Sequence, residues 1–347
     1  RKGRAKLGFA KTERITSQGF ATYIREFQSG HTLNAVAGYD YSEKNEELFN
    51  MTNYNFSVDG IKYWDIGKGS YLNDGKAEMK SEKKVTERLL ALFARANYSY
   101  QGKYLLQASI RHEGSSKFAS DNRWATFYSA SAGWRISNES FMEDIPWIDD
   151  LKIRVAYGEV GNNDFPATHM ANLLGSDVYW MLPSGEWAYS YGKTQNVNAN
   201  LGWESTKEWD FVIDYSFFKG RLYGKFDYYI KTTDNMLYEV KVPQPPYTNE
   251  KQWQNIGSME VKGWEFEVGG DIIRNKDFLW STNLNMSHEG GKIKTLRGDN
   301  TYMNGNGIPA SGSPGDAARI EEGSEMGSLS IWKFAGFDAD GGFLLYS

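Results

Sequence analysis

Apolar and polar residues alternate through the middle of the chain, from 88 to 137. One series carries Leu92, Ala94 and Ala96, and the positions between them carry Arg95 and Asn97. A period of two places the two series on opposite faces of a β-strand. The pattern resumes over 104–113 and 128–136. Each run has about ten residues, which is the length of a tilted strand that crosses a bilayer.

The apolar series has alanine and leucine in its middle and aromatic residues towards its ends. Tyr98, Tyr100 and Tyr104 gather around one short turn. An aliphatic band between aromatic girdles, with polar residues on the other face, is typical of the wall of a transmembrane barrel. The alternative is a large soluble β-protein with aromatic cross-strand pairs. The membrane interpretation is favoured, because a soluble core would be richer in valine, isoleucine and leucine.

Short turns and long connectors alternate along the rest of the chain. Hairpins are predicted at 19–43, 204–235 and 264–286, with a further strand at 152–160. The short turns are at 29–31, 101–103, 218–221 and 275–277, and the long connectors are at 44–87, 161–203 and 236–257. We expect all the turns at one rim and all the long loops at the other. Every proline falls in a predicted connector, as ladder hydrogen bonding requires: Pro146, Pro166, Pro183, Pro243, Pro245, Pro246, Pro309 and Pro314.

Composition narrows the class further. Aromatic residues make up 15% of the chain and there are 36 glycines and 8 prolines, which suits strands and turns. Mean hydropathy is −0.60, so apolar helical spans are not expected. The net charge of −5 gives no basic surface for nucleic acid. Cysteine is absent, which removes disulfides and thiolate metal sites.

The alternation predicts which side chains face outwards and which face the enclosed side. The outward set is Leu92, Ala94, Leu106, Ala108, Ala132, Phe211, Ile213, Phe226 and Phe266. The inward set, which would line a lumen, is Arg95, Asn97, Arg111, Ser131, Asp210, Asp214, Lys225, Asp227 and Asn283. A face with this many charges must be wet.

Four stretches together resemble the SusC/RagA family of TonB-dependent outer-membrane transporters. The most characteristic is ARANYSYQGKYLLQASIRHEGSSKFASDNRWATFYSASAGWRISNESF. The others are STKEWDFVIDYSFFKGRLYGKFDYYIKTTDNML, NIGSMEVKGWEFEVGGD and EEGSEMGSLSIWKFAGFDADG, in the same order along the chain. The resemblance implies an all-β, antiparallel up-and-down barrel of the 22-stranded class, with short periplasmic turns and long extracellular loops.

The resemblance also implies a function and partners. Such a transporter imports oligosaccharides or peptides across the outer membrane with a SusD-like lid lipoprotein, and TonB engages its N-terminal part. Residues 1–347 are expected to form only part of the barrel domain, without the plug domain, the closing strands or a secretion signal. The edges of such a partial sheet should remain unpaired. A ladder between the strand at 19–28 and the last hairpin would instead indicate a small, self-contained diffusion pore.

No catalytic or metal-binding constellation emerges. His31, His112, His169 and His288 are dispersed, without the spacing of metal ligands. Glu204, Glu208, Asp210 and Asp214 are separated by even numbers of residues, so they share one face of a strand. We interpret them as part of a solvated lumen wall and not as the paired acids of a glycosidase. We therefore expect a non-enzyme with no cofactor and no metal.

The best binding candidates are the aromatic residues of the second long connector, which could stack on sugars or pack against peptides: Tyr179, Trp180, Trp187, Tyr189 and Tyr191. Packing of this loop on itself or against a partner protein is the favoured interpretation. The alternative functions for the whole chain are a soluble or surface carbohydrate-binding or adhesin protein and a passive porin.

Overall fold

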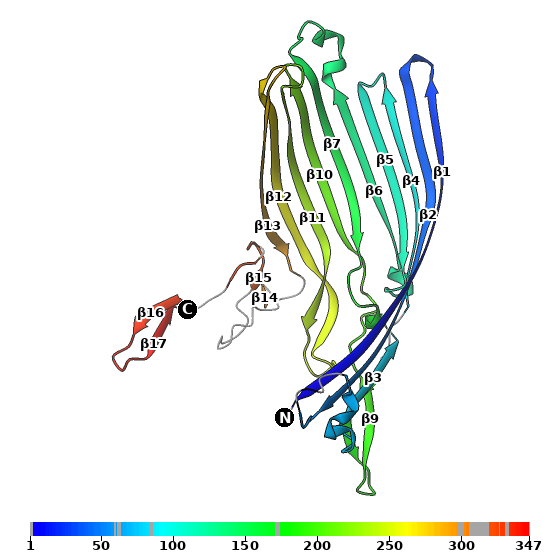
Figure 1. Ribbon diagram of the computed structural model, residues 1–347, viewed down its shortest axis with the longest axis vertical. Helices are drawn as coiled ribbons and strands as arrows, with labels where there is room; N and C mark the ends of the chain where they lie inside the picture. Colours follow the sequence, from blue (N-terminus) through cyan, green and yellow to red (C-terminus); the bar gives the residue numbers. More distant parts are fainter. Residues whose placement is uncertain are drawn as a thin grey trace.

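The computed structural model describes residues 3–58, 60, 64–83, 86–170, 174–296, 302–304, 319–325, 327–329 and 333–346. Its main element is an 11-stranded antiparallel sheet (Figure 1). The order across the sheet is β1-β2-β4-β5-β6-β7-β10-β11-β12-β13, and β3 pairs with β2. Consecutive long strands are therefore neighbours, which is the up-and-down arrangement expected from the sequence.

The strands of this sheet are long. They are β1 Arg4–Phe27, β2 His31–Tyr54, β3 Glu78–Lys83, β4 Glu87–Tyr100, β5 Tyr104–Ser115, β6 Trp124–Arg135, β7 Ile148–Asn162, β10 Glu204–Phe217, β11 Leu222–Lys241, β12 Lys251–Arg274 and β13 Leu279–Thr295.

Three two-stranded hairpins lie outside the main sheet: β8 Leu174–Met181 with β9 Trp187–Lys193, β14 Tyr302–Asn304 with β15 Arg319–Glu321, and β16 Lys333–Phe337 with β17 Phe343–Tyr346. The described helices are short 3₁₀ turns: η1 Gln28–Gly30, η3 Ile66–Lys68, η4 Ser70–Leu72, η5 Ser120–Asn122, η6 Ile136–Asn138, η7 Ser140–Met142 and η8 Ala167–Met170. Among the described residues, no helix has the length and apolar character needed to cross a membrane.

The placement of turns and loops agrees with the prediction. The connections β1–β2, β4–β5, β10–β11 and β12–β13 are tight and lie at the upper end of the sheet in Figure 1. The long connections lie at the lower end, where the labels of β3 and β9 are found. Several turn residues have positive φ, among them Gly30 at 80° and Gly102 at 65°, a region that glycine enters without steric cost. We call these two ends the turn end and the loop end.

Several predicted boundaries were wrong, because strands continue beyond the apolar band. The connector assigned to 44–87 begins with strand: β2 runs to Tyr54 and keeps its pairing with β1 down to Arg4. In the connector assigned to 236–257, only 242–250 lies between strands. The last hairpin, predicted to end at 286, continues in β13 up to Thr295. A strand segment that is polar on both faces shows no alternation of apolar and polar residues. The hydropathy pattern therefore predicts only the part of each strand that lies within the membrane.

The 161–203 connector contains the β8–β9 hairpin, and the connection between β6 and β7 contains the short turns η6 and η7. The six prolines within the described residues lie outside strands, as predicted. Pro309 and Pro314 lie outside the described residues.

The pairing register of neighbouring strands places the residues of each predicted face side by side. Phe211 pairs with Val155 on one side and Tyr228 on the other, and Ile213 pairs with Ile153 and Phe226. Residues directly opposite each other share a face, so the outward set forms one continuous apolar surface. Its larger members are exposed, with Phe211 at 41% and Ile213 at 40%, whereas Val212 between them is at 1%. The apolar surface is the convex side of the curved sheet.

The sheet is open. Its first and last strands, β1 and β13, each have one neighbour, and no ladder joins them in the part of the chain that the structure describes. The prediction of an open, curved sheet is confirmed. The small self-contained barrel is not formed by these strands.

A small cluster of well-packed apolar residues lies at the loop end. Phe118, Phe165 and Leu201 are at most 2% exposed, and Trp203 and Trp253 pack against them. These residues come from three connections and one strand, so this small core fixes the loops on the end of the sheet.

At the turn end, the Glu139 carboxylate receives three side-chain donors. The Tyr104 hydroxyl donates to it at 2.7 Å, the Trp134 indole at 3.0 Å and the Lys103 ammonium at 3.1 Å. These hydrogen bonds, with the largest effect from Tyr104, lower the pKa of the Glu139 carboxyl. The carboxylate thus ties the β4–β5 turn to the segment after β6.

We expect Glu139→Gln to lower the stability of this turn end at pH 7. A carboxyl whose folded-state pKa is depressed stabilises the fold above its unfolded pKa, and this contribution disappears as the pH falls through the folded pKa. The difference between wild type and variant should therefore be largest near neutrality and shrink in acid. Thermal unfolding of the full-length protein in detergent at pH 7 and at about pH 3 measures it. Glu143→Gln is the matched control, and an equal effect of both variants would contradict the prediction.

Candidate functional site

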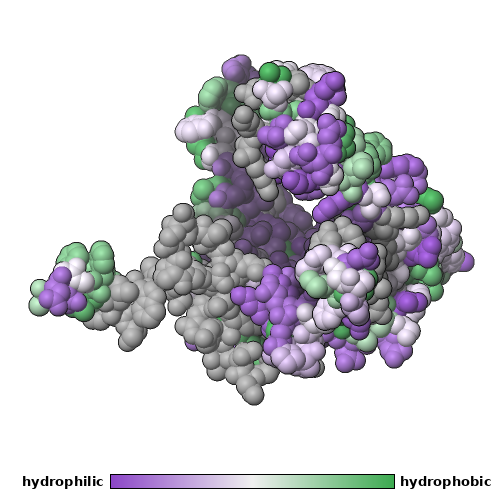
Figure 2. All heavy atoms as spheres, turned by 90° about the horizontal axis from the view of Figure 1, so that it is seen from below, coloured by the Kyte–Doolittle hydropathy of each residue, from purple (hydrophilic) through white to green (hydrophobic). Residues whose placement is uncertain are grey.

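The concave face of the sheet carries the polar residues that the sequence assigned to a lumen. In the view from below, hydrophilic residues line the hollow of the curved sheet (Figure 2). Register places all seven predicted lumen-lining residues on this one face: Arg95, Asn97, Arg111, Asp210, Asp214, Lys225 and Asp227. The candidate site is therefore a wall spread over many strands, without a single enclosed pocket.

Charges of opposite sign alternate on this concave wall. Lys152 lies 3.1 Å from Asp214, and Lys225 lies 2.6 Å from Asp227, nitrogen to oxygen. Asp210 and Asp227 are diagonal neighbours on this face of the β10–β11 ladder. Such a wall presents both hydrogen-bond donors and hydrogen-bond acceptors to a polar solute. Its electrostatic potential is not dominated by charges of one sign.

A second group of polar residues on this face forms a shallow recess near the turn end. Arg111 is not part of this recess: it lies further towards the loop end, where it reaches Asp40 at 3.5 Å and also pairs with Glu113. Arg154 and Lys152 line the recess, whose volume is about 340 Å³, together with amides and hydroxyls of neighbouring strands: Thr32, Asn34, Asn97, Ser99, Gln107 and Ser131. The recess offers hydrogen bonds but no catalytic geometry, because no nucleophile–base pair faces it.

The sequence reasoning missed Lys152 and Arg154. The alternation in the strand predicted at 152–160 was sufficient to find them, because Ile153, Val155 and Tyr157 share one side of it and leave Lys152 and Arg154 on the other. It also missed the amides that fix the loop end, since residues outside the strands carry no periodic signal.

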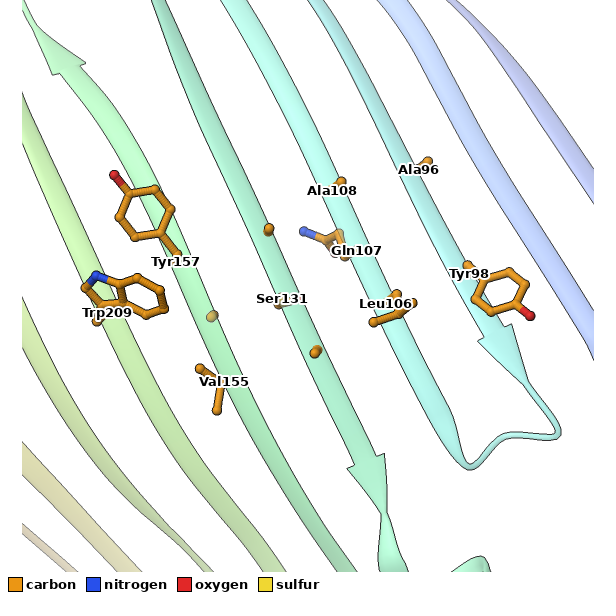
Figure 3. A pocket seen from close by; sticks show the side chains of 12 residues that line it. Ala96, Tyr98, Leu106, Gln107, Ala108, Ser131, Val155, Tyr157 and Trp209 are labelled. Atoms are coloured by element: carbon orange, nitrogen blue, oxygen red, sulfur yellow. The ribbon is translucent and has the colours of Figure 1, made fainter.

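The apolar face carries its own groove, of about 470 Å³, where alanines leave space between larger side chains (Figure 3). Ala96 and Ala108 lie in the groove, and Leu106, Tyr157 and Trp209 border it. This groove lies on the convex side, away from the polar wall. It belongs to the surface that the alternation assigns to lipid.

The five predicted loop aromatics are placed on the β8–β9 hairpin. Tyr179 pairs with Tyr189, Trp180 with Ala188, and Trp187 with Met181. Consecutive ladder positions alternate between faces, so Trp180 and Trp187 lie on opposite faces of the hairpin. Trp180 is 65% exposed and Trp187 is 64% exposed. These two rings therefore do not pack the loop on itself. Tyr191 lies further along β9, and the side chains of the three tyrosines lie outside the described residues.

Buried amides attach the base of this hairpin to β12. Asn196 donates to the carbonyls of Asn249 and Lys251 at 2.7 and 2.9 Å. Asn255 accepts from the Gly202 N–H at 2.8 Å and donates to the Gly202 carbonyl at 2.9 Å. Because these bonds are to backbone, they hold the segment after β9 in one position while β8–β9 projects beyond it.

The acidic row and the histidines do not form a reaction centre. Glu204 accepts from Asn162 and from the Leu237 N–H, and Glu208 lies 3.8 Å from Lys231. Among the described residues, no group of three or more histidine, aspartate or glutamate side chains is arranged to hold a metal ion.

The sheet has an apolar convex face and a polar concave face, with tight turns at one end and long loops at the other. Together these features define the wall of a transmembrane β-barrel. The model of the family "TonB dependent receptor-like, beta-barrel" matches residues 5–342. The chain is 32% identical to TonB-dependent receptor P39 of Formosa agariphila over 92% of its length, and 35% identical to TonB-dependent receptor SusC of Bacteroides thetaiotaomicron over 65%. The structure of the RagAB peptide transporter superposes on 99% of the chain with a TM-score of 0.77 and 25% identity.

The chain belongs to the TonB-dependent receptor β-barrel family, within its SusC/RagA group. Members of this family are outer-membrane transporters and receptors, so the chain lies in the outer membrane, with its turn end towards the periplasm and its loop end outside. The chain covers 29% of P39, 23% of SusC and 36% of the RagAB structure's matched chain.

Proposed function

We propose that this chain forms part of the barrel of an outer-membrane importer of oligosaccharides or peptides. The observation that carries the proposal is the continuous polar concave face backed by a continuous apolar convex face. The named relatives support it: one is called TonB-dependent receptor SusC, and one structure is of a peptide transporter. Further strands complete the barrel beside β1 and β13, because unpaired edges in lipid cost several kcal/mol for each backbone group.

The partners follow from the same proposal. TonB drives uptake through a part of the protein outside this barrel segment, and a SusD-like lid lipoprotein covers the loop end. The lumen-lining charges Arg95, Arg111, Asp214 and Lys225 make the wall wet and supply hydrogen bonds to a passing polar solute. The protein moves its substrate without changing it, so no catalytic residue and no cofactor are assigned.

Uptake measurements on the full-length protein in its own cells test this function. Labelled oligosaccharides and peptides are offered to cells with and without the gene, with and without collapse of the inner-membrane proton gradient. An importer should accumulate one of the two classes, and only while the gradient is present. Entry that depends on the gene but not on the gradient would identify a passive porin, and absence of uptake of both classes would refute import of glycans and peptides.

We propose Trp180 and Trp187 as substrate contacts, because two exposed indoles projecting from a fixed base provide apolar faces at low entropic cost. Trp187→Ala should weaken substrate binding roughly tenfold, since an aromatic contact of about 1.4 kcal/mol corresponds to that factor. Calorimetry on the purified full-length protein measures the affinity. Trp147→Ala, at the periplasmic turn end, is the matched control.

The lid lipoprotein is the competing occupant of the β8–β9 hairpin. If Trp187→Ala and Trp180→Ala leave substrate affinity unchanged but reduce co-purification of the lid, the hairpin is a partner contact and the substrate assignment is wrong. If neither changes, these indoles contact neither substrate nor lid.

A further inference from the structure

A group of lysines lies on the convex face of β12 and β13, at the outer edge of the membrane-spanning band. Lys262, Lys292 and Lys294 surround the Glu260 carboxylate, and we call these four residues the lysine cluster. The Lys262 ammonium lies 2.9 Å from one Glu260 oxygen and the Lys294 ammonium lies 3.5 Å from the other. Glu260 pairs directly with Lys292 in the β12–β13 ladder. One carboxylate therefore pairs with two ammonium groups and has the backbone of a third lysine directly opposite it.

The depth of the lysine cluster follows from the register. The periplasmic turn lies at 275–278, and Ile272 is the outward residue beside it. From there, about ten residues of β12 lead to Lys262, which is the number that a tilted strand needs to cross the hydrocarbon. Trp264 lies on the membrane side of Lys262 and pairs with Tyr228 and His288 on the neighbouring strands. These rings form the aromatic girdle at the outer interface.

A groove of about 390 Å³ opens between the lysine cluster and the aromatic girdle. Its lining combines cations and carboxylates above with rings below: Tyr228, Glu260, Lys262, Gly263, Trp264, His288, Gly290, Lys292 and Glu325. Gly290, directly opposite Lys262 in the ladder, has no side chain and no atom near the position that a Cβ would take. Space is thus left beside the Lys262 ammonium, at the level where lipid headgroups meet water.

The charges favour an anionic occupant. The ammonium groups of Lys262 and Lys292 and the carboxylates of Glu260 and Glu325 line this groove. Lys294, which pairs with Glu260 from outside the lining, adds a third cation, so the group as a whole has one excess positive charge. Lys262 and Lys294 are half-exposed, with 52% and 49% of their side chains accessible, while Glu260 beneath them is at 26%. The cations can therefore turn towards a ligand outside, and the carboxylate is the less accessible partner.

We propose that the lysine cluster binds the phosphate of an outer-leaflet lipid whose acyl chains lie along the apolar face below Trp264. Ammonium groups bind phosphate as point charges, and basic residues close to a membrane surface contribute strongly to the retention of anionic lipids. The position at the membrane interface selects a lipid over a soluble anion, because the headgroup and the chains are recognised by adjoining surfaces. This inference rests on the place of the chain in the outer membrane and does not depend on its substrate.

Lipid affinity of the purified full-length transporter tests the proposal. The probes are monophosphorylated lipid A and the same lipid without its phosphate, added to the protein in phosphatidylcholine nanodiscs, with retention measured by native mass spectrometry. Wild type should retain the phosphorylated lipid more strongly. Lys262→Gln and Lys294→Gln should each weaken retention roughly fivefold, the factor that about 1 kcal/mol per lysine gives.

Two controls separate this site from a general effect of charge. Lys276→Gln removes an exposed lysine at the periplasmic turn and should leave retention unchanged. Glu260→Gln removes the competing carboxylate and should strengthen retention, whereas a purely structural ion pair would only lose stability. Gel mobility with and without heating checks that each variant is folded.

Equal retention of the two lipids by wild type would overturn the proposal. So would unchanged retention in the Lys262→Gln/Lys294→Gln double variant. Displacement of the phosphorylated lipid by inorganic phosphate at equal concentration would also overturn it, because it would show a phosphate site without lipid selectivity. Substrate uptake by the double variant should stay normal, so failure here is distinguishable from failure of the import function.

Discussion

Replacing Ile213 by arginine is expected to destabilise the membrane-embedded protein by about 2–4 kcal/mol, the cost of a cation at the middle of the lipid-facing surface of a barrel. Ile213 is on the convex face, pairs with Ile153 and Phe226, and is 40% exposed to the space that lipid fills. An arginine here has no carboxylate among its ladder partners and must reach for the interface. Urea unfolding of the full-length protein in lipid vesicles measures the change.

The control for this prediction is the same substitution on the other face. Asn97→Arg adds a cation to the concave wall, where Asn97 pairs with Gln107 and lines a wet recess. Its effect should stay below about 1 kcal/mol, as for surface substitutions in water. If Asn97→Arg costs as much as Ile213→Arg, the assignment of lipid and lumen to the two faces is wrong.

Replacing Asn255 by alanine is expected to release the base of the β8–β9 hairpin. The Asn255 side chain bonds both the N–H and the carbonyl of Gly202 and also the Asn235 carbonyl at 2.8 Å, and the residue is 8% exposed. Removing the amide leaves these buried backbone groups without this partner, at about 1–3 kcal/mol each. Amide exchange over 196–203 should therefore accelerate roughly 30-fold, the factor for about 2 kcal/mol.

Hydrogen–deuterium exchange on the full-length protein measures this release. Asn283→Ala is the matched control, because Asn283 is an exposed amide that bonds only the Glu267 side chain, at 3.3 Å, among the contacts described here. The two variants should differ in 196–203 and agree elsewhere. Unchanged exchange over 196–203 in Asn255→Ala would show that the small apolar core around Phe118 and Leu201 fixes the loop end without the amide.

The membrane-depth part of the fold was predictable from the sequence, because each strand there faces two different solvents. Lipid on one side and water on the other force apolar and polar side chains to alternate, so Ala94 and Arg95, or Ile213 and Asp214, report their faces directly. The short turns were predictable for a related reason: a two- to four-residue connection between two alternating runs leaves room only for an antiparallel hairpin.

The parts that project into water were not predictable in the same way. Residues 44–54 of β2 have water on both sides, so their composition does not alternate, and only the ladder with β1 establishes them as strand. The β8–β9 hairpin and the amides that support it also depend on partners far along the chain, as Asn255 with Gly202 shows. The loop aromatics were recognised as candidates, but the opposite placement of Trp180 and Trp187 required the register of the hairpin.

The sequence by itself thus determined the class of protein, the order of the strands and the two faces of the wall, since the contrast between lipid and water acts on every residue in turn. The tertiary structure alone decided where strands end, which loop residues are fixed and which side chains meet on each face. Lys262, Lys292 and Lys294 are separated in sequence and come together around Glu260 only through the β12–β13 ladder. Contacts of this kind depend on register, and register is a property of paired strands that no single strand carries.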